Sequence, residues 1–209
     1  SDTFARECAY VLQDDVHIPV LTVRETIEYA CWVKMPEGTT VGARNARVSE
    51  LIKMMSLGKV ENSQVGDKEE FRGISGGQMK RLSIAVEIAH LPELIFLDEP
   101  TSGLDSSISL EVMTVVKNLA NQGRTCMSTI HQPSPEVFAL FNRCVLVSAG
   151  RVVYNGPADE ILDYFQRPEL NYIIRADEKD TINSAEYALE ICGGTRYPDG
   201  ENKPRQAPE

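Results

Sequence analysis

The stretch that decides the fold is residues 74–105, which read ISGGQMKRLSIAVEIAHLPELIFLDEPTSGLD. After a Ser-Gly-Gly turn, apolar residues recur at helical spacing and predict one apolar helix face: Met79, Leu82, Val86 and Ala89. The continuous apolar run Leu94–Leu97 is typical of a parallel strand that is covered on both faces. Taken singly, the turn and the strand are ordinary features, so the information lies in their order and spacing.

The polar residues of this stretch suit phosphate chemistry. Gly76 and Gly77 leave backbone N–H groups unobstructed at a helix start, where the partial positive charge favours an anion. Asp98 and Glu99 follow the apolar run, at the strand end where ligands gather in α/β sheets. One carboxylate can hold Mg²⁺, directly or through water, and the other can orient or deprotonate an attacking water. The pattern therefore indicates phosphoryl transfer.

Five motifs occur in the order found in ABC ATPases, and the chain resembles that family. Ile74–Gln78 resembles the signature sequence, with isoleucine where leucine is commoner, and Leu94–Glu99 resembles the Walker B strand. Ser102–Asp105 resembles the D-loop, Gln13 the Q-loop glutamine and His131 the switch histidine. The motif sequences TSGLDS and HQPS are most similar to those of subfamily G, the White and pleiotropic drug resistance transporters.

The resemblance implies a role for each motif, with ATP and Mg²⁺ as the cofactors. Asp98 would bind Mg²⁺ through water, Glu99 would be the general base, and His131 would steady the γ-phosphate. Gln13 would contact Mg²⁺ and the attacking water, and would sense the transmembrane domain of a transporter. The remaining nucleotide-binding residues lie in the signature and the D-loop: Ser75, Gly76, Gly77, Gln78 and Asp105. The signature residues would contact the ATP that a second ABC ATPase domain holds.

The same resemblance implies an α/β fold, with a P-loop NTPase-like parallel sheet and an α-helical subdomain. Residues 1–166 are expected to form part of an ABC ATPase domain, with the helical subdomain at residues 22–90. Residues 167–209 are expected to be a C-terminal extension or linker that is partly disordered. Within it, residues 183–187 resemble an Asn-Pro-Ala-Glu/Asp segment of subfamily G, with serine in place of proline.

Local patterns predict the remaining elements. Thr22 and Glu25 form a capping-box pattern before a helix that runs to Lys34. The other predictions are a strand at 8–12, helices at 43–56, 105–122, 137–141 and 158–165, a solvated loop at 60–73, a buried strand at 125–130 and a hairpin at 144–154. The helices before residue 57 would pack on their own core or meet a transmembrane partner, and their pattern is the same in both cases.

Composition narrows the functional class. A formal net charge of −10 argues against a nucleic-acid-binding protein, which usually has a basic face. No stretch approaches the ~18 apolar residues that span a bilayer, so a transporter's membrane part would lie outside this sequence. The five scattered cysteines show no CxxC pairing, which argues against a disulfide framework or a metal site.

The sequence contains no P-loop, GxxxxGK[ST], since its one Gly-Lys pair, Gly58-Lys59, is followed by Val60. The resemblance therefore covers the later part of an ABC ATPase domain, a fragment lacking the Walker A region. Residues 1–209 alone are expected neither to bind nor to hydrolyse ATP appreciably. Two alternatives stay open: an ABC-type ATPase of DNA repair or translation without membrane segments, and an inactive remnant that only docks.

Overall fold

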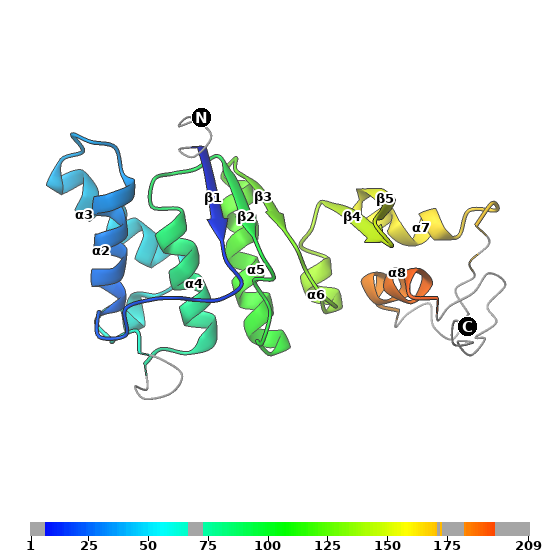
Figure 1. Cartoon of the computed structure of the whole chain (residues 1–209), viewed down its shortest axis with the longest axis horizontal. Coiled ribbons are helices and arrows are strands. Elements are labelled where there is room, and N and C mark those ends of the chain that lie inside the picture. Colours follow the sequence, from blue (N-terminus) through cyan, green and yellow to red (C-terminus); the bar gives the residue numbers. More distant parts are fainter. Residues whose placement is uncertain (1–6, 67–72, 171, 173–181, 195–209) are drawn as a thin grey trace. The chain divides into compact units, whose positions relative to one another are not determined.

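The computed structural model describes residues 7–66, 73–170, 172 and 182–194 (Figure 1). The chain divides into two compact units, residues 1–131 (unit 1) and residues 132–209 (unit 2). This boundary lies before the division predicted at residue 166. No helix within the described ranges is long and apolar enough to cross a membrane.

Unit 1 contains a parallel three-stranded sheet, as the sequence predicts. Its strands are β1 (Cys8–Val11), β2 (Leu94–Leu97) and β3 (Thr125–Ser128), and β2 lies between the other two. The last residues of the three strands are paired in register. The segments that follow the strands therefore leave the sheet at one common edge.

Only one face of this sheet is covered by the described residues. Ala9, Val11 and Ile95 point to the covered face and are at most 3% exposed. On the other face Tyr10 and Met127 are 52% and 56% exposed. The prediction of a buried strand at 125–130 is therefore wrong, since no residue of β3 is buried, and the predicted cover of Leu94–Leu97 on both faces is only partial among the described residues, because the two helices that contact the strands lie on the same side.

Those two helices are α4 (Gly76–Glu87) and α5 (Ser106–Asn121). α4 contacts β1 and α5 contacts β3, and the two helices also contact each other. The predicted apolar face of α4 is partly wrong, because Met79 and Val86 are only half-buried whereas Ile84 is fully buried. The helix is enclosed by α2, α5 and β1, so its buried surface is wider than one stripe.

The chain between β1 and β2 also forms α2 (Val23–Lys34) and α3 (Val41–Met54), followed by the short helix η1 (Gly58–Val60). The predicted capping box at the start of α2 is confirmed. The predicted inward residues are buried: Val23, Ile27, Ala30, Val48, Leu51, Ile52 and Met55. α4 lies between this helix pair and the sheet (Figure 1).

The polar segment before α4 is more ordered than a solvated loop. Residues 61–66 pair with residues 19–24 through backbone hydrogen bonds such as Val65 N to Leu21 O at 2.8 Å and Gly66 N to Pro19 O at 2.9 Å. Asn62, Ser63 and Gln64 are exposed, as a solvated loop requires, but Val65 and Gly66 are buried, so the prediction is wrong at these two residues. Its other half, residues 67–72, lies outside the described residues.

Unit 2 is built on the predicted hairpin. β4 (Arg143–Ser148) and β5 (Arg151–Pro157) are antiparallel, and positive φ angles at Ala149 (48°) and Gly150 (73°) form the turn. The short helices of this unit are α6 (Pro135–Phe138), η2 (Ala158–Glu160) and α7 (Ile161–Phe165), and α8 (Ser184–Cys192) completes it. The core contains buried residues of β5, α7 and α8: Tyr154, Ile161, Phe165, Tyr187 and Ala188.

α8 lies within the region predicted as an extension or linker, and it packs against α6 and α7. Asn183 is its N-cap and accepts a hydrogen bond from the Ala185 backbone N–H at 3.1 Å. Ser184 is therefore the first helical residue, a position that also favours proline because its N–H needs no partner within the helix. Of the stretch predicted as disordered, residues 195–209 lie outside the described residues.

Candidate functional site

The carboxyl edge of the sheet gathers polar residues from all three strands. Asp98 and Glu99 follow β2 directly, and the Asp98 backbone N–H donates to the Val11 carbonyl at 2.9 Å. The Thr129 backbone N–H donates to the Leu97 carbonyl at 3.1 Å. These continuations of the parallel ladder place the residues after each strand side by side.

Asp98 is held by one side chain from each neighbouring strand. The Thr129 hydroxyl donates to Asp98 Oδ1 at 2.7 Å, and the Tyr10 hydroxyl donates to Asp98 Oδ2 at 3.3 Å. The negative charge of Asp98 raises the pKa of Tyr10 above its usual value, which keeps the phenol protonated as a donor. Asp98 is thereby oriented, and both of its oxygens keep capacity to accept further hydrogen bonds.

Glu99 is fixed through both its side chain and its backbone. The Gln13 amide Nε2 donates to Glu99 Oε2 at 2.8 Å and reaches Ser102 Oγ at 3.4 Å. The Glu99 backbone N–H donates to Thr129 Oγ1 at 2.9 Å. Its φ of +42° is a left-handed conformation that non-glycine residues seldom adopt and that occurs more often at functional sites. The structure thus brings together Gln13, Asp98 and Glu99, as the sequence predicts.

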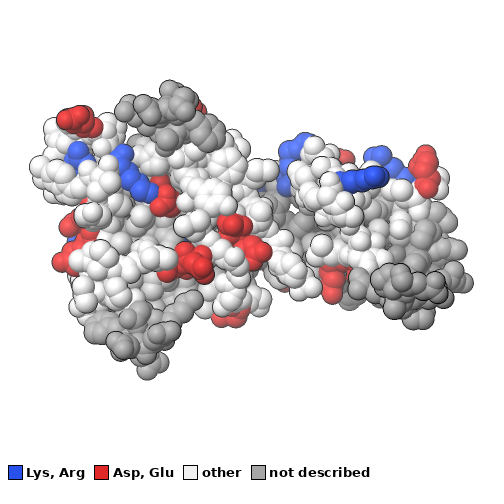
Figure 2. Space-filling view, viewed as in Figure 1, with Lys and Arg blue, Asp and Glu red and all other residues white. Residues whose placement is uncertain are grey.

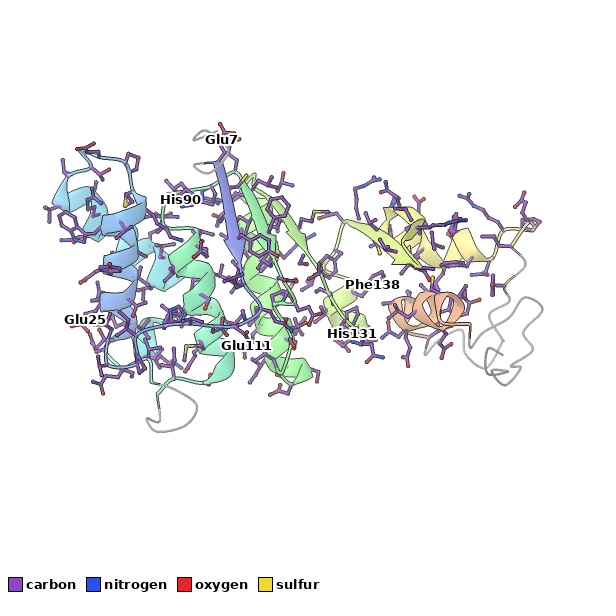
Figure 3. All side chains as sticks on the ribbon, in the orientation of Figure 1. Glu7, Glu25, His90, Glu111, His131 and Phe138 are labelled. Atoms are coloured by element: carbon purple, nitrogen blue, oxygen red, sulfur yellow. The ribbon has the colours of Figure 1, made fainter. Side chains whose placement is uncertain are left out.

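His131 follows β3 and is exposed. In Figure 3 it lies toward the end of the sheet where the strands finish, whereas His90 and Glu7 lie toward the opposite end. No hydrogen bond of the His131 ring is found within the described residues, so a γ-phosphate contact stays a prediction.

Figure 2 shows acidic side chains gathered on the displayed face of unit 1, in keeping with the net charge of −10.

The signature residues form a separate, local arrangement at the start of α4. Ser75 is the N-cap, and the Ser75 backbone N–H donates to Gln78 Oε1 at 2.9 Å while Gln78 N–H donates to Ser75 Oγ at 3.4 Å. Within the described ranges no hydrogen bond connects these residues to Asp98 or Glu99. The structure therefore does not bring the signature and the sheet edge together.

Gly77 has a packing role that the sequence does not reveal. A Cβ atom at Gly77 would come within 2.2 Å of Ile108 Cγ2 on α5, and one at Gly76 would come within 3.3 Å of Leu104 Cδ2. Gly77 is buried, whereas Gly76 is exposed. The interpretation of both glycines as unobstructed phosphate-facing positions is therefore incomplete, because a side chain at Gly77 would also overlap Ile108 where α4 packs on α5.

Asp105, the other residue assigned to nucleotide binding, is the N-cap of α5, and its Oδ1 accepts a hydrogen bond from Ile108 N–H at 2.9 Å. Sequence reasoning assigned no role at this edge to Tyr10 and Thr129. Their positions give a signal, since each lies within a few residues of a predicted site residue, Gln13 or His131, at a strand end.

The chain is similar in sequence to known proteins. Residues 1–102 match the family described as ABC transporter. The chain is 39% identical, over 99% of its length, to the broad substrate specificity ATP-binding cassette transporter ABCG2 of Sus scrofa, of which it covers 32%. It is 44% identical over 76% of its length to Protein white of Ceratitis capitata, covering 21% of it. It is 38% identical over 93% of its length to ABC transporter G family member 14 of Arabidopsis thaliana, covering 29%.

The fold, the clustered strand-end residues and these similarities define the class, an α/β domain of the ABC type. The chain belongs to the ABC transporter family, as a nucleotide-binding domain sequence of subfamily G. It spans at most 32% of the length of the three relatives named above.

Proposed function

We propose that these residues are the C-terminal part of the ATP-hydrolysing domain of a subfamily G transporter, which couples ATP hydrolysis to movement of a substrate across a membrane. The relatives are named as transporters, which disfavours an ABC-type ATPase of DNA repair or translation. The observation that supports hydrolysis most strongly is the 2.8 Å hydrogen bond from Gln13 Nε2 to Glu99 Oε2. It orients a carboxylate beside Asp98, at the edge where an α/β sheet binds its ligand.

In this proposal Glu99 is the general base. Its carboxylate takes a proton from a water molecule while the water oxygen attacks the terminal phosphorus of ATP. The bond from that phosphorus to the ADP oxygen breaks, which leaves ADP and phosphate. Gln13 holds Oε2 of Glu99, so Oε1 is left to accept the proton. His131 donates a hydrogen bond to the γ-phosphate from the same edge.

Asp98 fits the coordination of Mg²⁺. Among the described residues no group of three or more His, Cys, Asp and Glu forms a metal site. Mg²⁺ keeps several waters and is usually held by one or two carboxylates together with substrate phosphates. Asp98, oriented by Tyr10 and Thr129, would hold the ion through water, with Gln13 as a second contact. When bound, the ion neutralises charge that develops on the phosphates.

The proposed partners are a second ABC ATPase domain and the transmembrane domain of the transporter, with this domain on the cytosolic face of the membrane. Ser75, Gly76, Gly77 and Gln78, together with Asp105, would contact the ATP that the opposite domain holds. This assignment is supported by the geometry of the α4 start, where, among the described residues, the Ser75 and Gln78 side chains bond within one helical turn. Helix-start N–H groups directed outward would suit a phosphate from outside the unit.

The test is the Glu99→Gln variant of the whole transporter, purified and assayed in a membrane. Loss of the base is expected to lower the rate of phosphate release by about 10² to 10⁴-fold, while Mg²⁺-dependent ATP binding persists. Glu93→Gln is the matched control, because Glu93 is an exposed glutamate just before the same strand, at the opposite edge. Unchanged turnover in Glu99→Gln would remove Glu99 from the base role.

A further inference from the structure

A lysine on α4 is buried against the segment that contains Gln13. The Lys80 side chain is 3% exposed. Its ammonium group donates to the carbonyl oxygens of Leu12 at 3.2 Å and Gln13 at 2.8 Å, and it pairs with Asp15 Oδ1 at 2.8 Å. Three hydrogen-bond partners match the three protons of an ammonium group, and all three belong to residues 12–15.

Packing alone does not account for this lysine. Burying an ammonium group costs free energy unless it is paired and hydrogen-bonded, and an apolar side chain would fill the same position without that cost. The other α4 residues at this depth, such as Ile84 and Ala85, are apolar. The polar contacts of Lys80 therefore act to fix the position of residues 12–15.

A second set of contacts from α4 holds the same segment. The Ser83 hydroxyl donates to Asp15 Oδ1 at 2.7 Å, and His17 Nε2 lies 2.8 Å from Ser83 Oγ. Since the single hydroxyl proton of Ser83 is used on Asp15, the His17 ring donates to Ser83. Lys80 and Ser83 are three residues apart and share one helix face. One face of α4 thus fixes residues 12–17.

The contacts of Lys80 are connected, through Gln13, to the carboxylate of Glu99. The Gln13 carbonyl is held by Lys80, and the Gln13 side chain is in turn bonded to Glu99 Oε2 at 2.8 Å. The same helix begins with Ser75 and Gln78, the proposed contacts to the opposite ATP. A displacement of α4 therefore moves the anchor of Gln13 along with the signature.

We propose that Lys80 is a positioning residue. It fixes the Gln13 backbone so that the Gln13 side chain can bond to Glu99, and it connects Gln13 to the signature end of α4. This inference rests on the function proposed above for Glu99. Lys80 does not touch nucleotide in this scheme, because its three contacts are all with residues 12–15. Its loss should lower kcat for ATP and leave the KM for ATP unchanged.

The experiment is a double-mutant cycle on ATP hydrolysis by the whole transporter in membranes, with Lys80→Met, Gln13→Ala and both changes together. A misplaced catalytic group costs up to about 100-fold, so Lys80→Met is expected to lower kcat by at least about tenfold, with KM changed less than about twofold. If Lys80 acts through Gln13, adding Lys80→Met to Gln13→Ala should change kcat by less than about twofold, because coupled residues are not additive. Lys80→Arg, which retains the donors, should restore most of the kcat.

Ile84→Val is the matched control, since it removes one methylene from a buried α4 side chain that has no polar group to hold residues 12–15. Its effect on kcat should be the same with and without Gln13→Ala. Asp15→Asn removes the ion pair in a milder way and should show the same non-additivity, so the inference stays testable if Lys80→Met does not fold. Equal fold-losses for Lys80→Met in both backgrounds, or no loss at all, would overturn the inference. Unchanged turnover in Glu99→Gln would instead overturn the proposed function.

Discussion

The carboxyl edge of the sheet and the start of α4 are built in opposite ways. At the sheet edge, Asp98 and Glu99 are hydrogen-bonded to residues far away in the sequence, Tyr10, Gln13 and Thr129. At the start of α4, the hydrogen bonds that the described residues show for the Ser75 and Gln78 side chains are with each other's backbone N–H, within one helical turn. The sheet edge is thus assembled from segments that are far apart in one chain, whereas the helix start is a preformed local turn, for which we propose a partner outside this unit.

This difference explains why the two regions should respond differently to mutation. A change at the sheet edge breaks bonds between strands and should affect the chemistry on the chain's own ATP. A change at the start of α4 should act through local packing or through a partner domain. Each prediction below tests one side of this contrast.

The largest expected effect in this comparison is that of Thr129→Val, which keeps the shape but removes the bonds to Asp98 Oδ1 and to the Glu99 backbone N–H. A hydrogen bond to a charged group contributes about 1.5–3 kcal/mol, so kcat for ATP hydrolysis should fall about tenfold or more. Thr129→Ser should retain most of the activity. Thr125→Val on the same strand, at the opposite edge, is the control and should leave kcat unchanged.

The next effect, on stability, concerns Gly77. In Gly77→Ala the new Cβ overlaps Ile108 Cγ2, so overpacking should lower the free energy of unfolding by about 1–3 kcal/mol. Ile108→Ala removes the overlapping atom, and the double variant should be more stable than the sum of the single effects predicts. Denaturant unfolding measures this coupling. If the two effects simply add, close packing is not the reason for glycine at this position.

The smallest expected effect concerns pH. Burial lowers the pKa of His17 from its usual value of 6.5, and the positive charge of Lys80 lowers it further. The negative charges of Asp15 and Glu87 raise this pKa, but the net shift is downward. The unfolded chain therefore binds the proton more readily than the folded chain. The contribution of His17 to stability is complete above pH 6.5 and is lost as the pH falls toward the lower pKa of the folded state.

His17→Gln should make thermal stability less dependent on pH between 7 and 5.5, since the titrating ring is removed while an amide donor to Ser83 is kept. His90, whose pKa is lowered mainly by burial, should retain its own part of the dependence. An unchanged slope in His17→Gln would show that the ring is protonated as easily in the folded chain as in the unfolded one.

Much of unit 1 could be predicted because its signals are local. The predicted capping box at Thr22 and the predicted helix start at Asp105 each depend on residues within one helical turn. The capping box at Ser75, which the structure adds, is equally local. The strand-end positions of Asp98 and Glu99 follow from the apolar run before them. The cluster with Gln13 was predicted from the family resemblance, and the structure adds the contact distances.

What could not be predicted depends on contacts between distant segments. The burial of Lys80 follows from three acceptors in residues 12–15, which helical periodicity cannot reveal. The requirement for glycine at Gly77 comes from Ile108 on another helix. The exposure of Met127, on the sheet face that the described residues leave open, could not be inferred from an apolar run, because such a run does not say which helices cover it.

The central claim is that the two regions serve two different ATP molecules. It can be tested in a transporter assembled from two such domains with distinguishable subunits. Glu99→Gln removes the base of one site. Gly76→Asp places bulk and negative charge at the signature, and it is preferable to Gly77→Asp because its Cβ meets only the end of the Leu104 side chain. A heterodimer with a single Glu99→Gln subunit first establishes the activity of one intact site.

The decisive measurement is then ATP hydrolysis by two heterodimers. With Glu99→Gln on one subunit and Gly76→Asp on the other, both lesions fall in one site, and activity should equal that of the single Glu99→Gln heterodimer. With both lesions on one subunit, each site has one lesion, and activity should be lost. The account is contradicted if activity remains only when the two lesions share a subunit, because the signature would then serve its own chain's ATP.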